Sequence, residues 1–347
     1  MDRQTLPSSI PYPVSWVNRF ALRLRRAWLP YWLISLMFFI LEAALLHGVS
    51  WLDGTYSFPF FQPAFLLMSA WTWGPIALIN SLNDLATSVL HKYHDLLKLE
   101  DEKSFELLKF RFTSSPARPV LITNFFFISV FLWFVFVIPF DILATWNTPT
   151  MIATILSGIP TFALGSGFYY HTIHMLIMVD RTYRLSKPFN LYDREPIFAF
   201  SELTARSSLA ILGLATLNIL LMPAAMTDPG ILFLEVTLVP GGLVVFVMPL
   251  WEAHRRLVEA KRKLQSTTEK KIESTINQLH LCLETDDTGK MEFLNKALAS
   301  LVIERDIVDK LPTWPWRKGM LTGVSSAVFL PLLLLVLQMY IQHWLQP

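Results

Sequence analysis

Seven long apolar stretches constrain this chain more than any other feature of its sequence. They run over residues 29–49, 60–82, 119–140, 151–179, 206–226, 230–251 and 319–342. Each is long enough to cross a bilayer as a helix, which needs about 20 mostly apolar residues. Only 16% of the residues are charged, whereas soluble domains carry about 25%. The sequence therefore predicts an all-α membrane protein with seven transmembrane helices.

The basic residues divide unequally between the two sides of this predicted bundle. If the N-terminus is cytoplasmic, the outer segments are 50–59, 141–150, 227–229 and 343–347, and none of them contains Lys or Arg. All 29 basic residues then lie on the inner side or at its interface. Because Lys and Arg are retained in short cytoplasmic loops, the pattern predicts an inner N-terminus and an outer C-terminus. We expect a multi-pass protein of the plasma membrane.

The segments outside the spans are predicted to be helices on the inner side. Residues 1–28 contain a basic amphipathic stretch, which is typical of an interfacial helix. Residues 29–251 would form a six-helix bundle with an inner helix at 83–112. Residues 252–318 show apolar residues at helical spacing and predict a long cytoplasmic hairpin, and residues 319–347 supply the last span and the outer C-terminus.

The apolar stripe of the predicted hairpin protrudes into water and needs a partner. We therefore expect a homo-oligomer whose subunits are held in register by a coiled coil. A signalling role for the hairpin is the alternative, because the same pattern suits both.

Two acidic residues lie within predicted spans, where ionisable side chains are costly and mark candidate functional sites. Glu42 comes late in the first span and Glu235 early in the sixth, so both fall in the outer half at similar depth. With His47 and Tyr169, they predict an outward-facing pocket for a small ligand. The alternative is that each acid is protonated or hydrogen-bonded to a neighbour.

Helix-breaking residues gather in the fourth span, which contains Gly158, Pro160, Gly165 and Gly167. A break in a transmembrane helix is tolerated where it lines a cavity. Small residues also let two helices approach closely, and we expect this second explanation to hold more often.

Six residues near the inner side have side chains that metals bind. They are His91, His94, His171, His174, Glu252 and His254. The first four form two pairs with three-residue spacing, which would suit a di-metal or haem site. One pair lies inside the predicted membrane and the other below it. We therefore expect these histidines to pack against neighbouring side chains rather than to bind a metal, and we predict no cofactor.

Other chemistry is not indicated by the sequence. We find no nucleophile–base constellation and no phosphate-binding loop, so we expect no enzyme. The formal net charge of +2 gives no bulk basic surface for nucleic acid.

The last span carries polar residues among its leucines. The candidate pore-lining residues are Ser325, Leu334, Leu335, Gln338, Ile341 and Gln342. Helical periodicity puts the two glutamines on adjacent turns of one face. Rings of uncharged polar side chains and apolar collars are the materials of a pore. The alternative is that both glutamines lie at the outer interface beside Trp344, where water satisfies them.

The order of these features resembles a known family. The chain resembles the seven-transmembrane ion channel superfamily of insect odorant and gustatory receptors in five features. These are seven spans, an inner N-terminus, short outer loops, a sixth helix prolonged into the cytoplasm and the stretch "LVLQMY". The resemblance implies a homotetramer whose last helices line a central cation pore. It also implies that Gln338 is the pore glutamine, that Leu334 or Leu335 lies near a hydrophobic gate, and that an outer-half pocket receives a small ligand.

We therefore expect an oligomeric channel, or a ligand-gated channel of chemoreceptor type. A secondary transporter is one alternative, although seven spans divide poorly into two halves and the sequence shows no internal repeat. A membrane sensor or scaffold that acts through the hairpin is another. A His-ligated metal or haem protein is the last.

Overall fold

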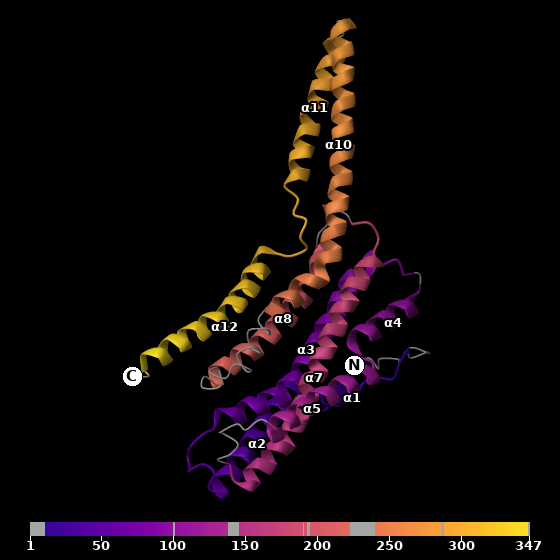
Figure 1. Cartoon of the computed structure of the whole chain (residues 1–347). Helices are drawn as coiled ribbons and strands as arrows, with labels where there is room; N and C mark the ends of the chain where they lie inside the picture. Colours follow the sequence, from indigo (N-terminus) through magenta and orange to yellow (C-terminus); the bar gives the residue numbers. More distant parts are fainter. Residues whose placement is uncertain are drawn as a thin grey trace.

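The described part of the chain is helical throughout its regular structure (Figure 1). The computed structural model describes residues 11–99, 101–137, 146–189, 191–192, 195–222, 240–285 and 288–345. Apart from the helices, these ranges contain two isolated β-bridges. The all-α fold class is confirmed for them.

The helices follow one another along the chain in a simple order. They are α1 (Trp16–Arg25), α2 (Tyr31–Leu52), α3 (Pro63–Tyr93), η1 (His94–Leu96), α4 (Glu102–Thr113), α5 (Ala117–Val137), α7 (Thr148–Arg184), α8 (Glu195–Leu221), η3 (Met248–Leu250), α10 (Trp251–Thr285), α11 (Thr288–Asp309) and α12 (Lys318–Leu345). Residues 240–247 are also helical and lead through η3 directly into α10.

Five helices in the described ranges are long and apolar enough to cross a membrane. Their spanning segments are Tyr31–Leu52, Pro63–Leu96, Thr148–Arg184, Phe198–Leu221 and Gly319–Leu337. They correspond to the first, second, fourth, fifth and seventh predicted spans. The chain is thus an integral membrane protein by the length and composition of its helices.

The other two predicted spans lie partly outside the described residues. The third, 119–140, falls largely on α5, whose apolar segment Ala117–Trp133 is shorter than the other five. The sixth, 230–251, is described only from residue 240 onward. The count of seven therefore stays a prediction.

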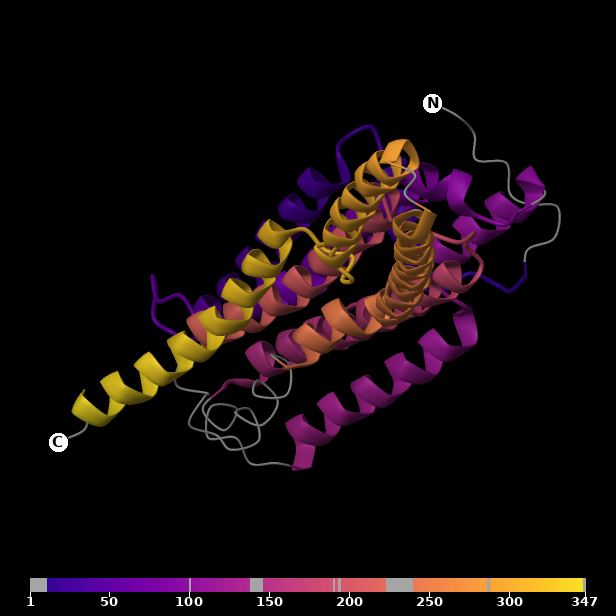
Figure 2. The same cartoon turned by 90° about the horizontal axis from the view of Figure 1, so that it is seen from above.

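The centre of the bundle is formed by α3, α7 and α8. Helix α3 packs along both α7 and α8, α2 lies against α3 and α7, and α5 lies against α7. Helix α12 packs on α8 at the edge of the bundle (Figures 1 and 2). With 37 residues, α7 is about 55 Å long at 1.5 Å per residue. It therefore exceeds the roughly 30 Å of a bilayer's hydrocarbon core.

An aromatic core lies where α3 and α7 end. The Tyr93 ring lies 5.8 Å from the Tyr183 ring and 4.8 Å from the Phe200 ring, centroid to centroid. The hydroxyls of Tyr93 and Ser186 are hydrogen-bonded at 2.7 Å. Phe112 of α4 stacks on Phe200 at 5.9 Å. These contacts join α3, α4, α7 and α8 into one packed end.

The inner helix predicted at 83–112 is two helices in the structure. Its first part forms the last turns of α3, and η1 and a short link then lead to α4. The reason is packing, because Leu90, Leu97 and Leu108 are all buried in the same core. Helix α4 folds back onto α3 and α7, which a single straight helix could not do.

Helix α1 is docked into the bundle by one face. Val17 and Ala21 are buried in the core, so the helix predicted within residues 1–28 packs on the bundle, and its place at the membrane interface stays a prediction. A Cβ atom added to Gly167 of α7 would lie 2.7 Å from Val17 Cγ2. A Cβ at Gly158 would likewise collide with the Phe131 ring of α5. Close helix packing therefore accounts for both glycines.

Helices α10 and α11 form an antiparallel hairpin that projects from one end of the bundle (Figure 1). The 35 residues of α10 extend about 50 Å. At the base, Lys261 Nζ donates to the carbonyl oxygens of Asp309 and Leu311 at 2.7 and 3.0 Å. Farther out, Thr268 donates to Glu304 Oε1 at 3.3 Å.

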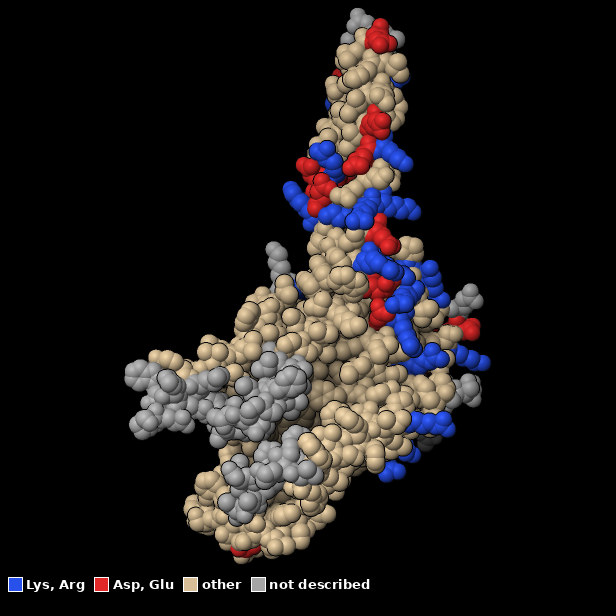
Figure 3. Space-filling view, viewed as in Figure 1, with Lys and Arg blue, Asp and Glu red and all other residues tan. Residues whose placement is uncertain are grey.

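Charged side chains gather along the hairpin and over the end of the bundle beside it (Figure 3). The visible face of the opposite end is almost entirely uncharged. The C-termini of helices α2, α8 and α12 point toward the uncharged end of the bundle (Figure 1). The base of the hairpin lies at the charged end (Figures 1 and 3). Charged residues are therefore distributed unequally along the long axis of the molecule, which has an apolar body and one charged end.

Candidate functional site

Glu42 is held by donors from two neighbouring helices. Trp73 Nε1 donates to Glu42 Oε2 at 2.6 Å, and Thr72 Oγ1 donates to Oε1 at 3.4 Å. The hydroxyl of Ser157 on α7 also donates to Oε1. The Thr72 hydroxyl is further hydrogen-bonded to Thr161 Oγ1 at 2.7 Å. The carboxylate thus joins α2, α3 and α7 inside the apolar body.

His47 lies on the same helix as Glu42 but has separate partners. The backbone nitrogen of Gln62 donates to its Nε2 at 3.1 Å, and its Nδ1 is hydrogen-bonded to the Ala43 carbonyl at 2.7 Å. The rings of Phe61 and Phe65 lie 5.1 and 5.3 Å from the imidazole, centroid to centroid. His47 is therefore buried in an aromatic lining at the α2–α3 connection.

The structure describes only one of the other two predicted pocket residues, Tyr169. Tyr169 stacks on Trp71 at 6.0 Å, and Trp71 Nε1 donates to Asn218 Oδ1 of α8 at 2.7 Å. Glu235 lies outside the described residues. Glu42 and His47 are satisfied from within the chain, so a ligand could bind them only by exchanging these partners.

His171 is the centre of a fully buried polar network. Its Nε2 is hydrogen-bonded to Asn83 Oδ1 of α3 at 2.9 Å. Its Nδ1 lies 2.8 Å from Ser115 Oγ and 3.2 Å from Asn18 Nδ2. Since the Asn83 oxygen only accepts, the imidazole donates from Nε2 and accepts at Nδ1. This is a neutral histidine with both nitrogens satisfied.

Asn18 extends the network to the N-terminal segment. Its Nδ2 also donates to the Thr113 carbonyl at 3.2 Å, and its Oδ1 accepts from Ser15 Oγ at 2.7 Å. The Ser15 nitrogen in turn donates to the Ser115 carbonyl at 2.9 Å. The network therefore ties α1 to α3, to α7 and to the α4–α5 link.

The remaining histidines are dispersed among other contacts. His174 Nε2 is hydrogen-bonded to the Arg111 carbonyl at 3.0 Å. His91 and His94 are exposed and lie beside the Phe105 ring. His254 stacks on Trp314 at 4.0 Å.

Glu252 is buried and accepts hydrogen bonds from Arg255 and Arg256. Among the described residues, no group of three or more His, Cys, Asp or Glu could hold a metal ion. The six candidate metal ligands are therefore not brought together as a site.

Helix α12 is attached to the described bundle along one face. Val324 and Pro331 are buried, and Leu334 and Leu335 are half-buried. Ser325 is half-buried as well, whereas Ile341 is exposed. Gln338 and Gln342 lie on α12, but their side chains are outside the described part. Two leucines that are predicted pore residues are thus partly covered within the single chain.

The sequence patterns did not identify Asn18, Asn83 and Ser115 as partners of His171. They come from three distant segments and follow no period. One available signal is that Asn80 and Asn83 directly follow the apolar part of α3, and buried amides require partners.

In comparisons with known proteins, the chain matches no family model, no curated protein and no solved structure.

Proposed function

We propose that the chain is one subunit of a homo-oligomeric ion channel of the plasma membrane, with four copies around a central cation path. In this proposal the protein has seven spans, an inner N-terminus, an outer C-terminus and a cytoplasmic α10–α11 hairpin. The gathering of Lys and Arg at the hairpin end (Figure 3) supports this orientation, because basic residues are retained on the cytoplasmic side.

The observation that carries the proposal is the uncovered surface of α12. Only 11% of its most apolar window is buried, compared with 33% in α2 and 56% in α7. Lipid would satisfy the apolar part of this surface. Ser326 is also exposed on it, and Gln338 and Gln342 follow in the sequence. Uncharged polar groups are costly in lipid, whereas a path containing water would satisfy them.

A second uncovered surface lies on the hairpin. Phe293, Ile303 and Ile307 are 70%, 60% and 49% exposed on α11, and their spacing puts them on one side of the helix. We call these three residues the α11 apolar face. The hairpin carries many charged residues, so it lies outside the hydrocarbon and lipid tails cannot cover this face. Another copy of the chain would bury it.

Both surfaces belong to neighbouring parts of the molecule. Helix α11 lies on the side of α10 toward α12 (Figure 1). One set of neighbouring subunits could therefore cover both, with the hairpins held together above the α12 helices. The resemblance to the seven-transmembrane ion channel superfamily implies the same arrangement, with Gln338 in the path and Leu334 or Leu335 at its constriction.

A small ligand acting on the outer half of the bundle remains part of the proposal. Glu42 links α2, α3 and α7. A ligand that exchanged one of its three donors would loosen the contact between these helices.

The number of subunits tests the assembly. We expect the purified protein, of 39.9 kDa per chain, to have the protein mass of four copies in a detergent micelle by native mass spectrometry. The double substitution Phe293→Ser and Ile307→Ser should shift the population toward smaller species, because it removes apolar area from the proposed contact.

A matched control uses the same helix. Asn295 and Ala299 are exposed but lie outside the α11 apolar face, so changing both to Ser should leave the mass unchanged. A strictly monomeric native protein would contradict the proposal. A tetramer that the double substitution leaves intact would contradict the role of the α11 apolar face.

A further inference from the structure

A cavity of about 580 Å³ lies at the base of the hairpin, between α10 and the segment that joins α7 to α8. Five basic side chains line it: Lys98, Lys187, Arg255, Arg256 and Lys263. The acidic side chains in its lining are Glu252 and Glu259. The lining therefore carries a formal net charge of +3. Its volume falls in the range of small-molecule sites, about 300–1,000 Å³.

Backbone pairing brings together two of the lysines from segments far apart in the sequence. The backbone nitrogen of Lys98 donates to the Leu185 carbonyl at 3.1 Å, and the backbone nitrogen of Lys187 donates to the Leu96 carbonyl at 2.8 Å. These bonds flank the isolated bridge between Leu97 and Ser186. The two lysines are thus fixed at one rim by the fold itself.

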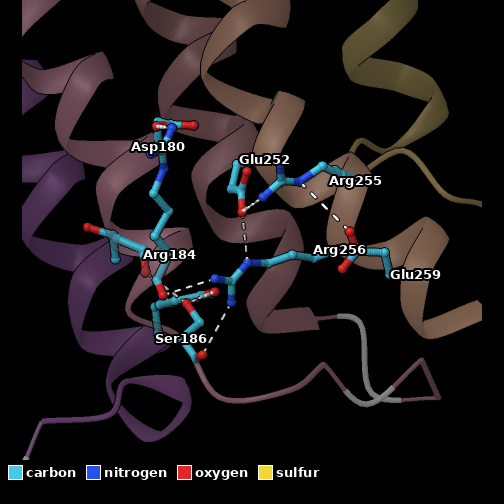
Figure 4. A network of polar contacts seen from close by, with 9 residues as sticks. Asp180, Arg184, Ser186, Glu252, Arg255, Arg256 and Glu259 are labelled. Atoms are coloured by element: carbon cyan, nitrogen blue, oxygen red, sulfur yellow. Dashed lines mark hydrogen bonds and ion pairs between the residues drawn. The ribbon is translucent and has the colours of Figure 1, made fainter.

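Arg256 and Glu252, which both line the cavity, belong to one network of polar contacts (Figure 4). Glu252 is buried, and Arg256 Nε donates to its Oε1 at 3.1 Å. The other Arg256 nitrogens donate to the carbonyls of Arg184 and Ser186 at 2.9 and 3.3 Å. These carbonyls lie at the end of α7, where the helix dipole attracts cations. Arg256 is therefore committed to joining α10 with α7.

Among the other basic groups, the Lys187 ammonium donates to the Asp95 carbonyl at 2.9 Å, whereas Arg255, Lys98 and Lys263 keep donors available to a ligand. Arg255 is 62% exposed, and besides its bond to Glu252 it faces Glu259 at 4.0 Å. The side chains of Lys98 and Lys263 are exposed, and neither ammonium group forms a hydrogen bond or ion pair with the described residues around it. An excess of exposed cations around a formed cavity favours a multiply charged anion.

Aromatic residues indicate the depth of this cavity in the membrane. Trp251 of α10 packs against Trp314 at 5.9 Å, and Trp314 stacks on Trp316 at 4.3 Å. Tryptophans gather at the membrane–water interface. Arg255 and Lys263 lie one and three turns farther along α10, on the water side of this cluster. The cavity therefore lies at the height that a large lipid headgroup reaches.

The wall of the cavity is apolar. Phe189, Leu191 and Leu264 are among its lining residues. Such a wall suits a ring or a glycerol backbone, while the cations suit the phosphates. Basic pockets on the cytoplasmic side of membrane proteins recognise phosphorylated headgroups by this combination.

We propose that this cavity binds a ligand with several phosphate groups on a small ring, either the headgroup of a phosphoinositide in the inner leaflet or the corresponding soluble inositol polyphosphate. Lys98, Lys263 and Arg255 contact the phosphates, and the Arg256–Glu252 pair holds α10 against α7. The site rests on the proposed cytoplasmic position of the hairpin and does not depend on ion conduction.

The test measures binding to the full-length protein in detergent by microscale thermophoresis. The probes are dioctanoyl phosphatidylinositol 4,5-bisphosphate, inositol 1,4,5-trisphosphate and dioctanoyl phosphatidylcholine. We expect the bisphosphate lipid or the trisphosphate to bind, and phosphatidylcholine not to bind. Tight binding of the lipid alone identifies a membrane ligand, and equal binding of the free trisphosphate identifies a soluble one.

The variant Lys98→Gln with Lys263→Gln should weaken binding about 25-fold, since each membrane-surface lysine contributes roughly fivefold. Lys98→Arg with Lys263→Arg should retain it. The control is Lys103→Gln with Lys310→Gln, which removes two exposed lysines that do not line the cavity. Absence of binding by either phosphorylated probe, or an equal loss in the control, would overturn the proposal. Elution profiles in size-exclusion chromatography verify that each variant is folded.

Discussion

The carboxylate of Asp53 accepts two hydrogen bonds from Thr150, one from its backbone nitrogen at 2.9 Å and one from its hydroxyl at 2.7 Å. Thr150 lies in the first turn of α7, whose backbone nitrogens have no partner within the helix. Asp53 follows α2, so a residue about 100 positions away supplies the N-terminal cap. A further hydrogen bond runs in the other direction, from the residue before α7 to the end of α2: Asn147 Nδ2 donates to the Asp53 carbonyl at 2.7 Å.

This cap predicts a pH dependence of stability. Burial raises the pKa of Asp53, but the hydrogen bonds from Thr150 and Thr55 together lower it further, so the folded pKa lies below the usual value. A lowered folded pKa means that the contribution is complete above the unfolded pKa of about 4. It is lost as the pH falls through the folded pKa.

We therefore expect Asp53→Asn to lower the thermal unfolding temperature by a constant amount above pH 5. The difference between wild type and variant should shrink below pH 4, where the wild-type carboxylate becomes protonated. Unfolding curves in detergent across this range measure it. A difference that stays the same at low pH would show that the charge does not form the cap.

Replacing Gly167 with Ala should destabilise the fold. The new Cβ would lie 2.7 Å from Val17 Cγ2, so α1 must shift, and overpacking of this kind costs about 1–3 kcal/mol. Gly48→Ala is the matched control, because nothing lies within 4 Å of a Cβ there and alanine favours a helix. Thermal unfolding compares the two. Equal effects would mean that α1 does not pack on α7 as described.

Glu42→Leu should destabilise the bundle by about 1–3 kcal/mol, because Trp73 Nε1 and the Ser157 hydroxyl lose their acceptor in an apolar environment. Glu42→Gln keeps one acceptor oxygen and should have a smaller effect. The expected order of unfolding temperatures is wild type, then Gln, then Leu. A fully stable Leu variant would favour a ligand role for Glu42 over a structural one.

His171→Ala should cost about 2–4 kcal/mol, because it leaves a cavity and removes the partner of Asn83 and Ser115. His94→Ala is the control, since His94 is exposed and lies at the surface. Elemental analysis of both proteins gives a second measurement. Stoichiometric metal in wild type that His171→Ala removes would contradict the assignment of a packed, neutral histidine.

The spans and the hairpin are the parts of this fold that the sequence indicates best. Long apolar segments have few alternatives in lipid, so their positions follow from composition. Helix α3 was harder to delimit, because charged residues begin at Asp84 although the helix continues to Tyr93. The hydropathy of the sequence shows where the membrane-spanning part of α3 ends. The helix itself continues beyond that point because Tyr93 packs into the aromatic core.

The polar contacts could not be predicted for a different reason. The sequence marks Glu42 as a costly acid within a span. Its donors Trp73 and Ser157 come from α3 and α7, and no periodic pattern in the sequence shows which side of each of these helices faces Glu42. The cap of Asp53 on Thr150 likewise joins the end of α2 to the first turn of α7, two segments about 100 residues apart in the sequence. The basic cavity likewise depends on the pairing of residues 96–98 with 185–187, which is not visible as a motif.

The current through planar bilayers that contain the purified protein measures whether α12 lines the proposed ion path. An ion path lined by α12 predicts discrete unitary cation currents from wild type and a clearly altered unitary conductance for Gln338→Leu. Bilayers shown to contain the assembled protein but carrying no current, or unitary currents identical in the two proteins, would contradict it.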